Sequence, residues 1–300
     1  MGNNLENELA VGKSGIGAGV ERPHSCTNFL PYILVFPAVM VILLLYLYPL
    51  LTSFWKSFIS KEGVLSLANY EKTLRLYRYD ILFTLGVTVL STFIGTVLSI
   101  LVAVYLRLSK GWLANSIGIL YRLPIFLPFV VVAQMMRSFL APHGILNLFL
   151  AKLNIIDIEN PLQLFNWVGL TFGFIWKEAP FMILIILGGF QMIDNSYIEA
   201  AKSVGAKLPQ IITKILIPMN QSTILIAVTL VFCSLVGCFS FPYMLIGGKS
   251  PVTITVDIAH RVNYFGDYGV ANALGVFSYI MVSLLAIYYV RSMMKKGLYE

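Results

Sequence analysis

The residues best placed to do chemistry in this chain are Lys177 and Glu178, a base and an acid that stand side by side inside a long apolar block. If this block spans a membrane, each charge is costly unless it is paired or hydrated. Because adjacent residues on a helix do not face each other, each side chain is expected to find its own partner or to face water. Two interpretations stay open with equal weight: the residues line a water-filled path, or they tie helices together.

The surroundings of this pair suggest an irregular stretch of backbone. Trp176 stands directly before Lys177, and Pro180 follows two residues after Glu178. A helix broken by proline at membrane depth often borders a cavity. Aromatic residues of the next apolar block are further candidates, although such residues are more often packing residues or interface anchors. The candidates for the wall of a translocation path are Trp176, Lys177, Glu178, Phe241 and Tyr243.

Patterns typical of catalysis, metal binding or nucleotide binding are missing from the sequence. The three cysteines and three histidines form no ligand cluster, and there is no metalloprotease or serine-hydrolase motif. Two Gly-Lys-Ser triplets, at 12–14 and 248–250, lack the glycine that a phosphate-binding loop needs five positions earlier, where Asn7 and Tyr243 stand. The sequence therefore predicts a chain that is no enzyme and holds no cofactor or metal.

Composition determines the class of protein. Hydrophobic residues make up 58% of the chain and charged residues 12%, with a mean hydropathy of +0.82. Soluble domains carry about twice as many charged residues. A membrane-spanning helix needs about 20 apolar residues, so we expect an all-α integral membrane protein with six transmembrane helices. The six apolar blocks lie near 29–55, 81–106, 117–140, 165–192, 219–246 and 268–292.

The segments outside these blocks are tails and loops. Residues 1–28 are polar and rich in glycine, which is typical of a flexible tail, and 294–300 form a short C-terminal tail after a membrane domain at 29–293. The net charge of +7 comes from scattered basic residues, a pattern that favours contact with lipid headgroups and not with nucleic acid. Six spans put both termini on one side, and basic residues only slightly favour the cytoplasmic side.

The most polar stretch between two apolar blocks, 193–218, predicts two short helices. Ser196 and Glu199 have the spacing of a capping box, in which each side chain satisfies an amide at the start of a helix. Gly205 suits the left-handed position where a helix ends. Pro209 suits the first turn of a second helix. Isoleucines on one side of that helix would face the protein, and Pro218 would mark the return to the membrane.

This stretch resembles the signature loop of the permease subunits of binding-protein-dependent ABC importers. The resemblance rests on Glu-Ala-Ala, a glycine four residues later and an Ile-x-x-Pro ending. The matching residues are Glu199, Ala200, Ala201, Gly205, Ile215 and Pro218. Other elements extend it over most of the chain, among them the L-x-N-Y-like residues 67–70 and the small-residue stretch 268–271.

The resemblance implies a type I importer permease fold in which six helices form half of the pathway. It implies that loop 193–218 is cytoplasmic and docks on an ATPase subunit, so that ATP and Mg²⁺ belong to that partner. A second, homologous permease, an extracytoplasmic solute-binding protein and membrane lipid are the other expected partners. The expected place is the cytoplasmic (inner) membrane of a prokaryote, with both termini in the cytoplasm.

The resemblance also suggests a solute. Sugar-type permeases usually carry Asp before the glycine of the loop, whereas this chain has Val204. Together with 193–196, this favours the polyamine-type branch and a solute like spermidine or putrescine, with a sugar as the alternative. A secondary transporter driven by an ion gradient is the alternative of another class. It would be expected to show an inverted repeat and several intramembrane acids, whereas Glu178 is the single deeply placed acid.

Overall fold

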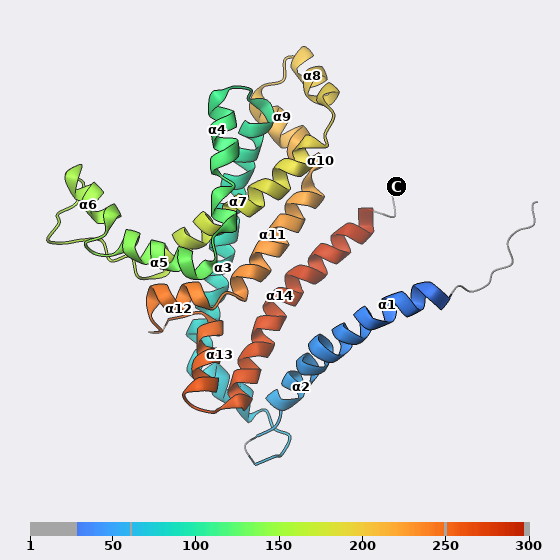
Figure 1. Cartoon of the computed structure of the whole chain (residues 1–300), viewed down its shortest axis with the longest axis vertical. Coiled ribbons are helices and arrows are strands. Elements are labelled where there is room, and N and C mark those ends of the chain that lie inside the picture. The colour runs from blue at the N-terminus through green and yellow to red at the C-terminus, as the bar shows by residue number, and fades with distance from the viewer. Residues whose placement is uncertain (1–28, 61, 249–250, 297–300) are drawn as a thin grey trace, which may run out of the picture. The chain divides into compact units, whose positions relative to one another are not determined.

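The computed structural model describes residues 29–60, 62–248 and 251–296, and over these ranges most of the backbone is helical (Figure 1). The β-pairing found there is an isolated bridge between Ile59 and Leu65. The chain divides into two units, 1–52 and 53–300. Helical structure is expected at membrane depth, because lipid offers no partners to backbone amides and carbonyls.

The first unit contains helix α1 (Phe29–Ile42), a π-helical turn (Leu43–Leu47) and the start of α2 (Tyr48–Ser57). In the π turn the amide of Tyr48 reaches the carbonyl of Leu43, five residues back. This widened turn ends two residues before Pro49, which has no amide to donate. All side chains from 33 to 49 are exposed, as expected of a helix that lipid or protein must cover.

The second unit packs four long helices together. These are α3 (Ala68–Leu108), α7 (Trp167–Gln191), α11 (Gln221–Val236) and α14 (Tyr268–Lys296). The described residues include five helices long and apolar enough to cross a membrane, or six if one pair bent by 73° counts as a single span. The predicted class, an all-α membrane protein, is confirmed. The core contains large side chains of α7 and its neighbours, such as Leu170, Phe174, Met182, Ile186 and Phe190.

Two predicted spans are not continuous helices. The block at 117–140 contains α4 (Trp112–Leu120), a 3₁₀ turn (Leu123–Phe126) and α5 (Phe129–Leu140). Pro124 and Pro128 explain the break, because proline removes a donor and pushes the preceding residue out of the helical region. Leu127, before Pro128, is accordingly extended. Helix α6 (Ile145–Lys152) follows α5.

The block at 219–246 is also divided. Helix α11 ends at Val236, and after Gly237 a separate short helix, α12 (Ser240–Ile246), packs against α5. The block at 81–106 differs in the other direction, because α3 begins thirteen residues earlier, at Ala68. Composition shows where apolar residues lie, but it does not show where a helix bends or continues past the apolar part.

The early start of α3 depends on Asn69. Its side-chain amide donates to the carbonyls of Ser57 (3.0 Å) and Ile59 (2.8 Å), and the hydroxyl of Tyr70 lies 2.7 Å from that of Ser57. A Cβ on Gly269 would lie 2.7 Å from the Asn69 side chain, so the start of α14 approaches it closely. The elements at 67–70 and 268–271 thus meet in space.

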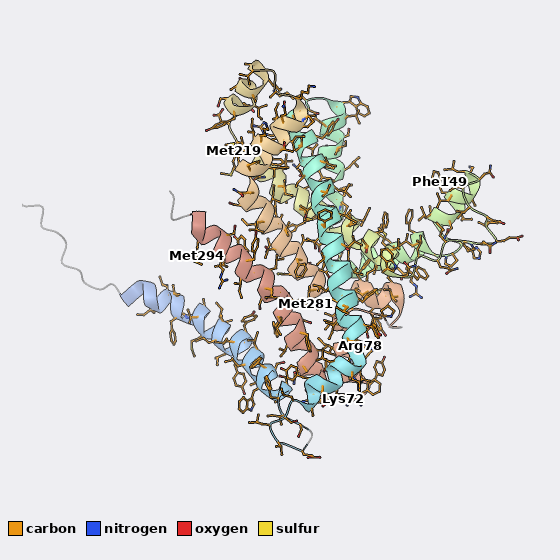
Figure 2. The ribbon with its side chains drawn as sticks, turned by 180° about the vertical axis from the view of Figure 1, so that it is seen from behind. Lys72, Arg78, Phe149, Met219, Met281 and Met294 are labelled. Carbon is orange, nitrogen blue, oxygen red and sulfur yellow. The ribbon has the colours of Figure 1, made fainter. Side chains whose placement is uncertain are left out.

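A charged cluster joins α3 to α13 (Ile254–Asn263) and the turn after it, at the end of the unit away from α8 (Figure 1). Lys72, labelled on α3 in Figure 2, pairs with Asp267 at 2.5 Å, and Arg261 lies 3.7 Å from the same carboxylate. Asp80 accepts the amide of Val252 at 2.9 Å. These contacts anchor the segment that leads into α14.

Asp257 lies buried on α13, and its Oδ2 has no hydrogen-bond partner among the described residues. Burial, together with the negative charge of Asp80, raises the pKa of the Asp257 carboxyl to about 8, against the opposing effect of Arg261. An unfolded aspartate has a pKa of about 3.9. The folded chain therefore binds more protons than the unfolded chain between these two values, and stability is lost as the pH rises through about 8.

We expect Asp257→Asn to weaken this pH dependence. The amide keeps the shape of the side chain but carries no charge, so the melting temperature of the purified protein at about pH 8.5 should rise by a few degrees. Glu71→Gln, at an exposed position of α3, is the matched control and should leave the profile unchanged. An unaltered pH profile in Asp257→Asn would contradict the assignment.

Candidate functional site

Helix α8 (Asn195–Ser203) forms the first half of the predicted loop, and its N-terminus is capped by Asp194. The amide of Ser196 donates to Asp194 Oδ1 at 2.7 Å. This hydrogen bond from the Ser196 backbone lowers the pKa of the Asp194 carboxyl. The predicted capping box of Ser196 and Glu199 is therefore wrong: Ser196 lies inside the helix, because Asp194 accepts from the first turn as a carboxylate readily does.

The C-terminus of α8 confirms the predicted role of Gly205. This residue has φ +78°, the left-handed conformation that favours glycine. Its amide reaches the carbonyl of Lys202, and the amide of Ala206 reaches that of Ala201, both at 3.0 Å. These two bonds form a Schellman motif, which satisfies carbonyls at the helix end and reverses the chain sharply.

The second half of the loop is a short, irregular helix. It runs through α9 (Leu208–Ile211), a π turn (Ile212–Leu216) and α10 (Ile217–Met219). Pro209 lies in its first turn, as predicted. Pro218 lies two residues after the end of the π turn, and the chain then bends by 73° into α11. Met219, labelled in Figure 2, marks this bend.

The bend is tied to α7 by Asn220. This residue is buried, and its side-chain amide donates to the carbonyl of Ile186 at 3.0 Å. Gly189 makes the approach possible, because a Cβ there would lie 1.9 Å from Asn220 Oδ1. The two ends of the loop, after α7 and before α11, are thus held together at one point.

The surface of the loop is partly apolar and exposed. Ile198 anchors α8 on the protein with 3% of its surface accessible, whereas Met192 and Val204 are 88% and 84% exposed. Single exposed apolar residues are common on protein surfaces, so these two show that the loop is accessible and do not identify what covers it. Of the residues predicted to dock a partner, Glu199, Ala200, Gly205 and Pro218 are exposed, and Ala201 and Ile215 are half-buried.

Arg107, near the end of α3, clamps the start of this loop, a role that the sequence did not indicate. Its guanidinium donates to the carbonyls of Phe190 (2.9 Å) and Ile193 (2.8 Å) and to Asn195 Oδ1 (2.7 Å). The carbonyls at a helix C-terminus have no partners inside the helix and attract cations. Arg107 therefore connects α3, the end of α7 and the first turn of α8 in one rigid contact.

The adjacent charges of α7 find different partners, as expected. Lys177 Nζ donates to the carbonyls of Pro124 (3.1 Å) and Ile125 (3.3 Å) in the 3₁₀ turn. Glu178 is buried and accepts from the hydroxyl of Ser234 on α11 at 2.9 Å. Both contacts tie α7 to neighbouring segments.

The three aromatic candidates for the path differ in burial and in the surfaces that they contact. Trp176 is half-buried and borders a cavity of about 770 Å³ beside Gln134, Phe139 and Met244. Phe241 is fully buried, its ring centroid 5.4 Å from that of Phe174. Tyr243 is 38% exposed. The structure therefore does not bring the five path candidates together at one surface.

Comparison with known proteins identifies the family to which the chain belongs. The model of the family described as binding-protein-dependent transport system inner membrane component matches residues 95–296, more than half of the chain. The trehalose/maltose transport system permease protein MalF of Thermococcus litoralis is 24% identical over 314 residues, covering 97% of this chain and 98% of that protein. The spermidine/putrescine transport system permease protein PotB of Escherichia coli is 25% identical over 231 residues, covering 76% of this chain and 83% of that protein.

Solved structures show the same fold. A chain of a bacterial alginate ABC transporter, crystallised with a periplasmic protein that holds an alginate pentasaccharide, has a TM-score of 0.75 at 21% identity, covering 88% of this chain and 94% of that one. A chain of the MetNI methionine ABC transporter has a TM-score of 0.54 at 21% identity. The chain therefore belongs to the family of binding-protein-dependent transport system inner membrane components, and it is a permease subunit of an ABC importer.

Proposed function

We propose that this permease imports a carbohydrate, and that an ATPase subunit on another polypeptide drives it by docking on the α8 loop. The observation that carries the docking role is the exposed helix α8, capped at both ends, with Glu199 and Ala200 at its surface and Gly205 exposed just after it. A second permease would complete the pathway, and an extracytoplasmic binding protein would deliver the solute. The loop, and with it both termini, would face the cytoplasm.

Movement of the ATPase would reach the membrane helices through two contacts of the loop. Arg107 joins α8 to α3 and α7, and Asn220 joins the bend before α11 to α7. A pull on α8 is therefore shared by three long helices. Such a coupling biases the helices between two arrangements, one open to each side, as ATP is bound and hydrolysed.

Three observations favour a carbohydrate over a polyamine. Val204, which suggested a polyamine, is 84% exposed beside Gly205 on the docking loop, where no solute in the membrane would touch it. A polycation would need accessible carboxylates, yet Glu178 is buried against Ser234. The glucose import permease GlcT of Saccharolobus solfataricus, which is 26% identical over 87% of this chain, adds to the sugar-type relatives.

The proposed activity can be measured in cells that express the complete transporter. Labelled trehalose, maltose and glucose should enter in an ATP-dependent manner, and excess spermidine should not compete. Depleting ATP while an ion gradient persists should stop uptake, and an uncoupler with ATP maintained should not. Uptake that follows the ion gradient would refute the ATP-driven mechanism, and uptake of spermidine alone would refute the carbohydrate assignment.

Two substitutions in the α8 loop should prevent the ATPase subunit from docking. Glu199→Lys changes the exposed acid, and Gly205→Arg adds a large side chain in a left-handed conformation that costs about 1–2 kcal/mol for other residues. Each variant should insert into the membrane but lose its ATPase subunit on purification, with uptake at least about tenfold lower. Glu62→Lys, the same change at an exposed residue away from the loop, is the control. Normal co-purification of the ATPase with both loop variants would exclude the docking role.

Loss of the Arg107 clamp should separate ATP hydrolysis from transport. In Arg107→Ala the contacts to Phe190, Ile193 and Asn195 disappear, so α8 can bind the ATPase but no longer moves α3. We expect the ATPase to co-purify and to hydrolyse ATP while uptake falls about tenfold. Arg107→Lys should retain part of the uptake, because the ammonium can still donate to one or two of these oxygens. It should not retain all of it, because an ammonium lacks the fork geometry of the guanidinium. Arg75→Ala, at an exposed position of α3, is the control, and wild-type uptake in Arg107→Ala would disprove the coupling.

A further inference from the structure

Four rings of α12, α13 and their flanking residues form a continuous row, which we call the aromatic ladder: Phe239, Tyr243, His260 and Tyr264. Successive ring centroids lie 5.2, 6.1 and 5.6 Å apart. Phe239 and Tyr243 stack with an interplanar angle of 19°, and the later contacts are edge-on, at 77° and 73°. These are favourable geometries for aromatic pairs, so the ladder is a preformed surface.

The ladder is accessible, unlike the aromatic core beside it. Phe239 and Tyr243 are each 38% exposed and Tyr264 is 72% exposed, whereas Phe241, between the first two in sequence, is fully buried. Alternation along α12 thus separates packing rings from surface rings. The position of His260 is restricted by Gly248, at φ +74°, where a Cβ would lie 2.8 Å from the imidazole. The backbone at Gly248 therefore lies against the His260 ring, at one edge of the ladder.

The side-chain polar atoms of the ladder have no hydrogen-bond partners among the described residues. The hydroxyls of Tyr243 and Tyr264 and the ring nitrogens of His260 appear in no hydrogen bond there. The hydroxyls of Tyr70 and Tyr77, by contrast, contact Ser57 and Arg261. Exposed rings with free donors and acceptors at their edges are typical of ligand sites.

This chemistry fits a carbohydrate ring. The C–H face of a sugar is weakly positive and apolar, and it stacks on the negative face of an aromatic ring, while its hydroxyls exchange hydrogen bonds with groups at the ring edge. A polyamine would also seek aromatic faces. However, the acids of this region are occupied or covered: Asp257 is buried, and Asp267 pairs with Lys72 and Arg261.

The ladder lies near the mostly apolar cavity that Trp176 borders. Helix α13 lies at the end of the unit opposite α8, and α12 lies between α13 and α5 (Figure 1). Met244, the neighbour of Tyr243 on α12, borders that cavity. We propose that the aromatic ladder is a stacking site for a carbohydrate on the outer side of the permease, an inference that rests on the proposed function.

The test uses the complete transporter, with its partner permease, ATPase and binding protein, reconstituted in lipid vesicles. Uptake of labelled trehalose, maltose, glucose and spermidine is compared for Tyr243→Ala, Tyr264→Ala and the corresponding Tyr→Phe variants. The alanine variants should lower sugar uptake roughly 3- to 10-fold, whereas the phenylalanine variants, which keep the ring, should retain most of it. Tyr279→Ala, at a 46% exposed tyrosine of α14 outside the ladder, is the matched control.

Other results separate the possible failures. Sugar uptake by the wild type with unchanged uptake in both alanine variants would overturn the ladder and leave the proposed function intact. Uptake of spermidine and of no sugar would overturn both. Loss of the partner permease or the ATPase from the purified alanine variants would also overturn the ladder as a solute site, because it would identify a contact between subunits.

Discussion

Every backbone carbonyl that a helix break releases needs a new partner where water is scarce, and this constraint shapes the second unit of the chain. The breaks are served by side chains from other elements. Arg107 donates to carbonyls at and just after the end of α7, and Asn220 donates to the carbonyl of Ile186. Lys177 donates to carbonyls of the 3₁₀ turn, and Asn69 donates to carbonyls at the end of α2 and just after it. These polar contacts let the helices bend and stop where an importer needs a loop or a cavity.

The same contacts explain how the α8 loop, if it docks an ATPase as proposed, can act on helices that it does not contain. Helix α8 is anchored by Ile198 and by the cap at Asp194, and Arg107 links its first turn to α3 and α7. A loop held at both ends moves as a body, whereas a flexible loop would absorb the motion of an ATPase. On the opposite side, the charged cluster around Asp267 fixes the start of α14, so the exposed rings of α12 and α13 rest on a firm base.

Local chemistry made some features predictable. Glycine at position 205 and proline at position 209 act on the backbone of their own residues, so their places at a helix end and a helix start could be foreseen. The cap could not be foreseen, because Asp194, Ser196 and Glu199 all offer plausible oxygens. In the structure the Ser196 amide donates to Asp194. The break in the block at 117–140 coincides with Pro124 and Pro128, but transmembrane helices also tolerate proline, so these residues do not by themselves predict a break. The break in the block at 219–246 was missed because apolar composition is similar in a straight helix and in a broken one.

The sequence by itself determined the membrane class, the existence and exposure of the α8 loop, and its likeness to importer permeases, because these depend on composition and on short-range backbone preferences. The tertiary structure decided the partners of the isolated charges. Lys177 and Glu178 are adjacent in the chain, yet one meets the 3₁₀ turn and the other meets α11. It also decided the roles of Arg107 and of the aromatic ladder, because their contacts join residues far apart in sequence, which only packing brings together.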